Sequence, residues 1–180
     1  MYDLKVVHCA FELHPGVPPE GQPIPWPAER MSAAHARFEP VAAAEGLVYR
    51  TRSHWYNSVP AHEAALWADE HGDGEEFRRR VYRAYFADLL NIGSMDVLAE
   101  LASELGMPAH DLREALDQGR YREKVARQFQ YARDAGITGV PAYIVGRYLM
   151  VGAQPLEVYR ELIETAQAEQ AAEPVVERSP

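Results

Sequence analysis

The amino-acid sequence predicts an α/β fold in which a block of helices interrupts two shorter parts that contain strands. Between about residues 57 and 135, apolar side chains recur at the three- and four-residue spacing of amphipathic helices. Residues 4–14 alternate between two faces, and residues 142–151 hold two short apolar runs joined by a Gly-Arg turn. Because strands lie on both sides of the helical block, we expect an α/β frame with a helical insertion.

The part before the helical block is predicted to hold a strand, a connector and a helix. In residues 4–14 one face of the predicted strand is apolar, and its residues are Val7, Cys9, Phe11 and Leu13. The connector, residues 15–27, is rich in proline and should have little regular structure. Residues 28–45 form an alanine-rich helical stretch that we expect Pro40 to interrupt and Gly46 to stop.

Five helices are expected within the helical block, followed by a hairpin and a last helix. Four of the five are expected to end at glycines, which are Gly72, Gly106, Gly119 and Gly136. After the block, a turn at Gly146-Arg147 joins two strands, and a helix begins at Pro155. We therefore expect the parts of the chain to be residues 2–50, the helical insertion 57–135, a C-terminal α/β part 136–168 and a disordered tail 169–180.

Composition excludes several kinds of partner. The formal net charge of −9 argues against nucleic acid and anionic membranes, because both are bound by clustered lysine and arginine. The run Arg78-Arg79-Arg80 follows two glutamates, so it is interpreted as an ion-paired helix face. No apolar run is long enough to span a bilayer, and the first residues lack the pattern of a signal peptide. A cytoplasmic protein is expected.

The single cysteine limits the thiol and metal chemistry that the sequence can support. One cysteine forms no intrachain disulfide and no cysteine-rich zinc site. Because Cys9 lies within the predicted strand among apolar neighbours, we expect a buried structural residue without a catalytic role. The seven histidines include no pair at helical i, i+3 or i, i+4 spacing, so neither a metal site nor a cofactor is expected.

Several strings of residues carry a resemblance to a known family. They are Phe11-Glu-Leu-His-Pro15, Pro18-Pro-Glu-Gly21, Ala42-Ala-Ala-Glu-Gly-Leu47, Asn57 with Ala61-His62, Ala135-Gly-Ile-Thr-Gly-Val-Pro141 and Val151-Gly-Ala-Gln-Pro155. Together they resemble the DsbA-like thioredoxin family over roughly residues 2–165. The most similar branch is the FrnE-like cytoplasmic one, which is related to 2-hydroxychromene-2-carboxylate isomerases. The resemblance implies a thioredoxin-like fold with an all-helical insertion.

The resemblance also implies an activity for which this chain lacks the reacting groups. Family members are thiol–disulfide oxidoreductases with a Cys-x-x-Cys at a helix N-terminus, where the thiol pKa is lowered. This sequence has no such motif, and its resemblance begins after the β-α unit that carries it. We therefore expect the chain as given to be redox-inactive. Three explanations are open: a native start further upstream, which we favour, a strand supplied by another chain, or a rearranged sheet.

The resemblance assigns a substrate-binding site to the loop before the hairpin. Thr138, Gly139, Val140 and Pro141 resemble the cis-proline loop that holds a substrate peptide in an extended conformation. His62 is expected to face this loop. The implied partners are a thiol- or disulfide-containing protein or peptide, or a glutathione-like small molecule. An exposed sheet edge could also form a homodimer.

Two other functions stay open beside the oxidoreductase. The first is a non-redox module that binds peptides along the proline loop, and it predicts that Pro141→Ala loses affinity. The second is a glutathione-dependent isomerase or transferase of the chromene-carboxylate or kappa type. In that family the glutathione-activating residue belongs to the same segment that this sequence lacks.

Overall fold

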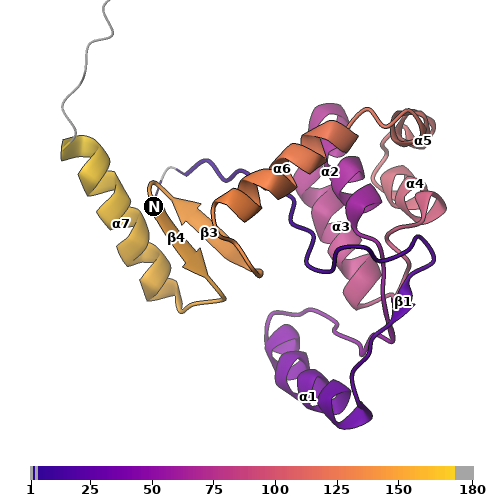
Figure 1. The fold of residues 1–180 in the computed structure, drawn as a ribbon, viewed down its shortest axis with the longest axis horizontal. Coiled ribbons are helices and arrows are strands. Elements are labelled where there is room, and N and C mark those ends of the chain that lie inside the picture. The colour runs from indigo at the N-terminus through magenta and orange to yellow at the C-terminus, as the bar shows by residue number, and fades with distance from the viewer. Residues whose placement is uncertain (1, 3, 173–180) are drawn as a thin grey trace, which may run out of the picture. The chain divides into compact units, whose positions relative to one another are not determined.

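The computed structural model describes residues 2 and 4–172, and in this part of the chain it has seven helices and four short strands (Figure 1). The chain divides into two compact units, the first ending at Gln130 and the second beginning at Tyr131. The two units are described separately below. None of the helices in the described residues is both long enough and apolar enough to cross a membrane.

The first unit contains a two-stranded ladder and most of the helices. Its elements are β1 (Gln22–Pro23), α1 (Ala28–Ala44), β2 (His54–Trp55), α2 (Val59–His71), α3 (Gly74–Phe86), α4 (Met95–Glu104), α5 (Ala109–Asp117) and most of α6 (Arg122–Asp134). β1 and β2 pair in antiparallel fashion. The five helices expected between residues 57 and 135 are therefore present, as α2 to α6.

Local sequence signals explain where these helices begin and end. The side chain of Asp73 accepts a hydrogen bond of 3.0 Å from the Glu76 backbone N–H and so caps the start of α3. After α4, Gly106 adopts a left-handed conformation with φ of 71°. The Met107 N–H then donates to the Ala102 carbonyl at 2.9 Å, which satisfies a carbonyl of the last turn.

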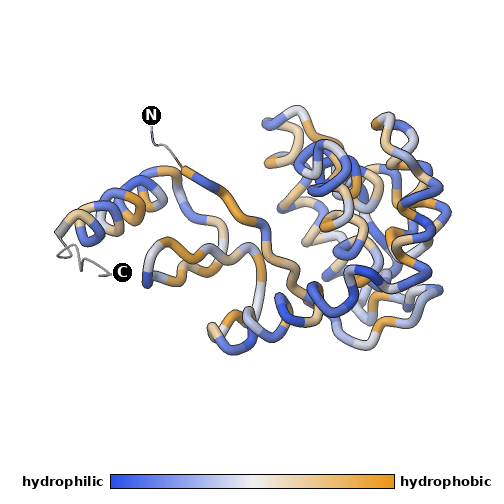
Figure 2. The backbone as a smooth tube through the Cα atoms, turned by 90° about the horizontal axis from the view of Figure 1, so that it is seen from above, coloured by the Kyte–Doolittle hydropathy of each residue, from blue (hydrophilic) through white to orange (hydrophobic). Residues whose placement is uncertain are grey.

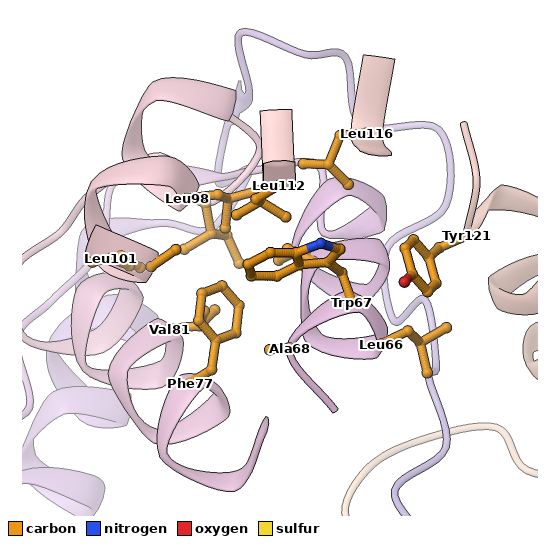
Figure 3. Packing of buried hydrophobic residues seen from close by; sticks show 14 of the residues in the cluster. Leu66, Trp67, Ala68, Phe77, Val81, Leu98, Leu101, Leu112, Leu116 and Tyr121 are labelled. Carbon is orange, nitrogen blue, oxygen red and sulfur yellow. The ribbon is translucent and has the colours of Figure 1, made fainter. Parts of the chain in front are cut away.

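The hydrophobic core of the first unit lies among α2, α3, α4, α5 and α6 (Figure 3). Trp67 is at its centre and has no exposed surface. The largest fully buried side chains are Trp67, Phe77, Leu98, Leu101, Leu112 and Val125. Since these residues recur at helical spacing in the sequence, the core follows from the amphipathic pattern of the helices.

The second unit is a β-hairpin followed by a helix. β3 (Ala142–Val145) pairs with β4 (Tyr148–Val151) in antiparallel register, with Ile144 opposite Leu149. α7 (Leu156–Ala172) packs on one face of the hairpin, where the rings of Tyr143 and Tyr159 meet edge-on at 5.1 Å. The hairpin, its turn at Gly146 and the following helix are those expected from the sequence.

The strand expected at residues 4–14 is wrong. The segment has no regular secondary structure, although hydrophobic colour recurs along it in Figure 2. A strand needs a hydrogen-bonding partner along its length, and no described strand pairs with this segment. Individual contacts to the helices hold it instead: the Ala10 N–H donates to Gln128 Oε1 at 2.9 Å, and His8 Nε2 lies 2.7 Å from Glu75 Oε2.

Two other expectations need adjustment. α1 continues through Pro40, which the sequence predicted would interrupt it. Proline removes a single backbone donor from the helix, and α1 buries none of its residues, so the surrounding structure tolerates the change. α7 extends to Ala172, into the stretch 169–180 that was expected to be a tail, and the rest of that stretch lies outside the described residues.

The basic run on α3 is ion-paired, as predicted. Arg78 Nη2 lies 2.5 Å from Asp69 Oδ2, and Arg80 contacts Asp88 at 3.0 Å and Glu104 at 2.6 Å. These arginines are therefore ion-paired with neighbouring carboxylates and do not form a basic patch for nucleic acid.

Candidate functional site

The predicted binding loop lies in the second unit, between α6 and β3. Gly136, with φ of 75°, ends α6, and its N–H donates to the Arg133 carbonyl at 2.9 Å. The Ile137 N–H donates to the Ala132 carbonyl at 3.0 Å, which closes the last turn of the helix. The chain then enters Thr138–Pro141 directly from a fixed helix end.

The loop joins the hairpin through Pro141. The Val140–Pro141 peptide bond is cis, as the strand context and the family resemblance predicted. The Pro141 carbonyl accepts a hydrogen bond of 2.7 Å from the Gly152 N–H, beyond the end of β4. This bond extends the β3–β4 ladder by one position and fixes the start of β3.

Three consecutive N–H groups of the loop have no hydrogen-bond partner in the part of the chain that the structure describes. The N–H groups of Thr138, Gly139 and Val140 make no hydrogen bond to any other described residue. The loop is also accessible, because Val140 is 52% exposed and a Cβ added at Gly139 would meet no atom within 4 Å. Since exposed backbone groups can receive an extended peptide, the loop has the chemistry of a β-addition site.

The hairpin that follows the loop has an apolar face opposite α7. The side chains of Ile144 and Leu149 are both 41% exposed, and Val151 is 47% exposed. These positions share one face because Ile144 pairs with Leu149 and strand residues alternate. Within the described residues, β3 and β4 pair only with each other, so both outer edges of this hairpin are without a strand partner.

His62 belongs to α2 in the first unit. Its ring meets Phe129 edge-on at 5.6 Å. Burial lowers the pKa of His62 from its ordinary value of 6.5 to about 4, so the imidazole is neutral at pH 7. Its predicted position opposite the loop stays a prediction, because the loop belongs to the other unit.

Cys9 is exposed, and the expectation of a buried structural cysteine is wrong. The residue does not lie in a strand that would bury one face, and its Sγ is 3.7 Å from the Gln128 carbonyl oxygen. Partial burial of the thiol nevertheless raises its pKa, so the thiol stays protonated at neutral pH. This is the opposite of the activation that a reactive cysteine needs.

A small cavity in the first unit was not predicted from the sequence. It has a volume of about 30 Å³ and is lined by Arg52, Ser53, His54, Tyr56, Tyr85 and Leu89. The run Arg52-Ser53-His54 is a short polar signal, but the residues it meets come from α3 and the turn after it. Among the described residues, no group of three or more histidine, cysteine, aspartate or glutamate side chains is arranged to hold a metal ion.

Comparison with known proteins adds a sequence and a structural relationship. The chain is 29% identical over 169 residues to the uncharacterized protein YwbO of Bacillus subtilis, which covers 92% of this chain and 84% of that protein. It is also similar to the crystal structure of a probable DsbA oxidoreductase, SCO1869, from Streptomyces coelicolor. That match has 30% identity and a TM-score of 0.88, and it covers 99% of this chain and 82% of the other.

A more distant structure shares the fold alone. The cytosolic disulfide reductase DsbM from Pseudomonas aeruginosa, solved with GSH, has a TM-score of 0.55 at 22% identity, over 83% of this chain and 77% of that protein. The family model of the DSBA-like thioredoxin domain matches residues 1–164. Assignment to the FrnE-like branch within the family remains a prediction. With most of its length matched by that domain, this chain belongs to the DsbA-like thioredoxin family.

Proposed function

We propose that this chain binds cysteine-containing peptides along the loop Thr138–Pro141. The peptide would bind in an extended conformation, and no thiol–disulfide exchange between two cysteines would take place. Membership of the DsbA-like family supports a thiol- or disulfide-containing substrate. The sequence holds a single cysteine. One thiol can attack a disulfide and form a mixed disulfide, but a second thiol must resolve that intermediate before the protein turns over.

The observation that carries this proposal is the run of unpaired amides at Thr138, Gly139 and Val140. An extended peptide placed beside them would accept hydrogen bonds from these N–H groups, as in other cases of β-addition. Each such bond contributes on the order of 1 kcal/mol, and the exposed apolar side chain of Val140 adds contact area. Peptide sequence would then matter less to affinity than an extended backbone and the cysteine.

The test removes one backbone donor from the loop. Val140→Pro lacks the N–H, whereas Val140→Ala keeps the N–H and loses most of the side chain. Fluorescence anisotropy of a labelled peptide that contains one cysteine measures the affinity of each variant. We expect Val140→Pro to weaken binding by about tenfold, which corresponds to roughly 1.4 kcal/mol, and Val140→Ala to weaken it much less.

Equal losses in the two variants would contradict a main-chain mode of binding. Circular dichroism and thermal unfolding of each variant show whether the hairpin has kept its structure. Glutathione added as a competitor addresses the other class of partner that the sequence suggested. If glutathione displaces the peptide from the wild-type protein, the loop also takes a small thiol ligand.

We also propose how the chain is divided into parts, where the protein is located and whether it forms a dimer. We infer that residues 2–50 and 136–168 form the thioredoxin-like part, with 57–135 as its helical insertion. We also expect a cytoplasmic location. Homodimerisation through the open edge of the hairpin is a further expectation, and sedimentation velocity over a range of protein concentrations tests it.

A further inference from the structure

We propose that the small cavity around Arg52 in the first unit binds a carboxylate group, carried by a small organic acid or by the C-terminus of a peptide. The site lies entirely within residues 1–130 and uses no residue of the loop Thr138–Pro141. It therefore goes beyond the proposed peptide-binding function, and the two can succeed or fail independently.

The charged group of the cavity has no counter-ion. The Arg52 guanidinium lies over the rings of Tyr85 and Phe86, at 4.7 and 4.5 Å from their centroids. Its Nε is buried without an acceptor among the described residues. Stacking on the aromatic rings holds the planar guanidinium in place, and its buried Nε–H is left without an acceptor. An anion would complete this arrangement.

Neighbouring charged groups do not fill that role. Asp88, which precedes Leu89 of the cavity lining, is 3.0 Å from Arg80 and is already paired. His14 is the other titratable group that senses Arg52: burial first, and then the charge of Arg52, lowers the pKa of His14. His14 is therefore neutral at pH 7, and Arg52 is the charge that a ligand at the cavity would meet.

The remaining lining supplies hydrogen-bonding groups at short range. Ser53 Oγ lies 2.9 Å from Nδ1 of His54, so the two side chains are held together. The rings of His54 and Tyr56 stack at 6.2 Å with an angle of 10° between their planes. Because Tyr56 carries a hydroxyl group, the cavity combines one permanent cation with a neutral donor, and carboxylate oxygens accept hydrogen bonds from both kinds of group.

The backbone at the rim of the cavity is strained. Leu89 is the non-glycine residue with positive φ among the described residues, at 60°. That conformation is unfavourable for a residue that carries a side chain. It is fixed by the turn that ends α3, where the Leu90 N–H donates to the Ala84 carbonyl at 2.8 Å. Strain of this kind concentrates at binding sites, where it places a side chain that relaxed backbone would not.

Size and charge favour a carboxylate over a larger anion. The cavity of about 30 Å³ has room for a small group such as a carboxylate. A guanidinium also pairs with a carboxylate through two parallel hydrogen bonds. The net charge of −9 disfavours a dianion more than a monoanion.

The experiment is an NMR titration of the full chain at pH 7 and constant ionic strength. Sodium acetate, sodium phosphate and a tripeptide with a free or an amidated C-terminus are added separately, and the side-chain Nε–H and nearby backbone signals are followed. We expect a saturable shift with acetate and with the free tripeptide, weaker binding of phosphate, and little response to the amidated tripeptide. A response to acetate but not to the free tripeptide would restrict the ligand to small acids.

Variants separate this site from general anion binding. Arg52→Gln should weaken acetate binding by at least about tenfold, whereas Arg50→Gln, at an exposed position nearby, should leave it unchanged. Arg52→Lys keeps the charge without the planar fork and should bind several-fold more weakly, which retains a test if Arg52→Gln is unstable. The proposal is overturned if the wild-type shift does not saturate, if phosphate binds more tightly than acetate, or if both Arg52 variants bind like the wild type.

Discussion

Mild acid should destabilise the first unit through His62. The ring is packed against Phe129, and burial lowers its pKa to about 4. In the unfolded chain a histidine titrates near 6.5. The unfolded state therefore binds a proton that the folded state does not bind between these two values. His62 therefore does not lower the free energy of unfolding above about pH 6.5. As the pH falls from 6.5 toward 4, the free energy of unfolding decreases.

The size of the effect follows from the two pKa values. At pH 5 an imidazole with a pKa of 6.5 is almost fully protonated, whereas one with a pKa of about 4 is mostly neutral. The difference in proton binding makes the folded state about 2 kcal/mol less stable at pH 5 than at pH 7.5. Because His62 retains partial exposure, this figure is an upper value.

Urea unfolding followed by tryptophan fluorescence measures the effect at pH 7.5 and pH 5. Carboxylates also titrate in this range, so the comparison uses His62→Gln, which does not ionise. The wild type should lose about 2 kcal/mol more than His62→Gln between the two pH values. His110→Gln, at an exposed position in the first turn of α5, serves as the matched control and should behave like the wild type. Equal losses in the wild type and His62→Gln would refute the reasoning.

Three further outcomes are expected. Gly106→Ala should destabilise the first unit by about 1 kcal/mol in urea unfolding, because φ is 71° there, and Gly106→Asn should cost less; equal stability of all three proteins would contradict this. Tyr121→Phe should cost about 1–3 kcal/mol, since Glu70 accepts a 2.6 Å hydrogen bond from the Tyr121 hydroxyl, and an unchanged urea midpoint would exclude that contribution. The protein should not accelerate insulin disulfide reduction; turnover that Cys9→Ser abolishes would show that this thiol is catalytic.

The helices could be predicted because their signals are local. Gly106 follows α4 and Gly119 follows α5, and both adopt the left-handed conformation, with φ of 71° and 62°. Such signals act within a few residues of the chain, so they can be recognised without knowing the rest of the fold. The hairpin of residues 142–151 was predictable for the same reason, because its turn joins two adjacent runs.

Features that depend on distant partners could not be predicted in this way. Residues 4–14 alternate like a strand, but alternation does not supply the neighbouring strand that a ladder requires. The wrong prediction that Cys9 is buried came from the same error, because burial was inferred from the strand, and the residue is exposed. The cavity at Arg52 was missed because its walls join residues 52–56 to Tyr85 and Leu89, which are far apart in the sequence.

The loop Thr138–Pro141 was predictable in part. Its position before the hairpin and its cis-proline were expected from the sequence and the family resemblance. The unpaired amides of Thr138, Gly139 and Val140 became visible only in the structure, because hydrogen bonding of a loop depends on what lies around it.

The most direct test of the account is to map by NMR which backbone amides respond when a cysteine-containing peptide binds. The measurement uses ¹⁵N-labelled protein and records the shift of every assigned amide during the titration. We predict that the largest shifts fall on Thr138, Gly139 and Val140, whose N–H groups have no hydrogen-bond partner among the described residues. A peptide that binds without shifting these three amides, or that shifts mainly residues of α2 to α5, would contradict the proposed binding site.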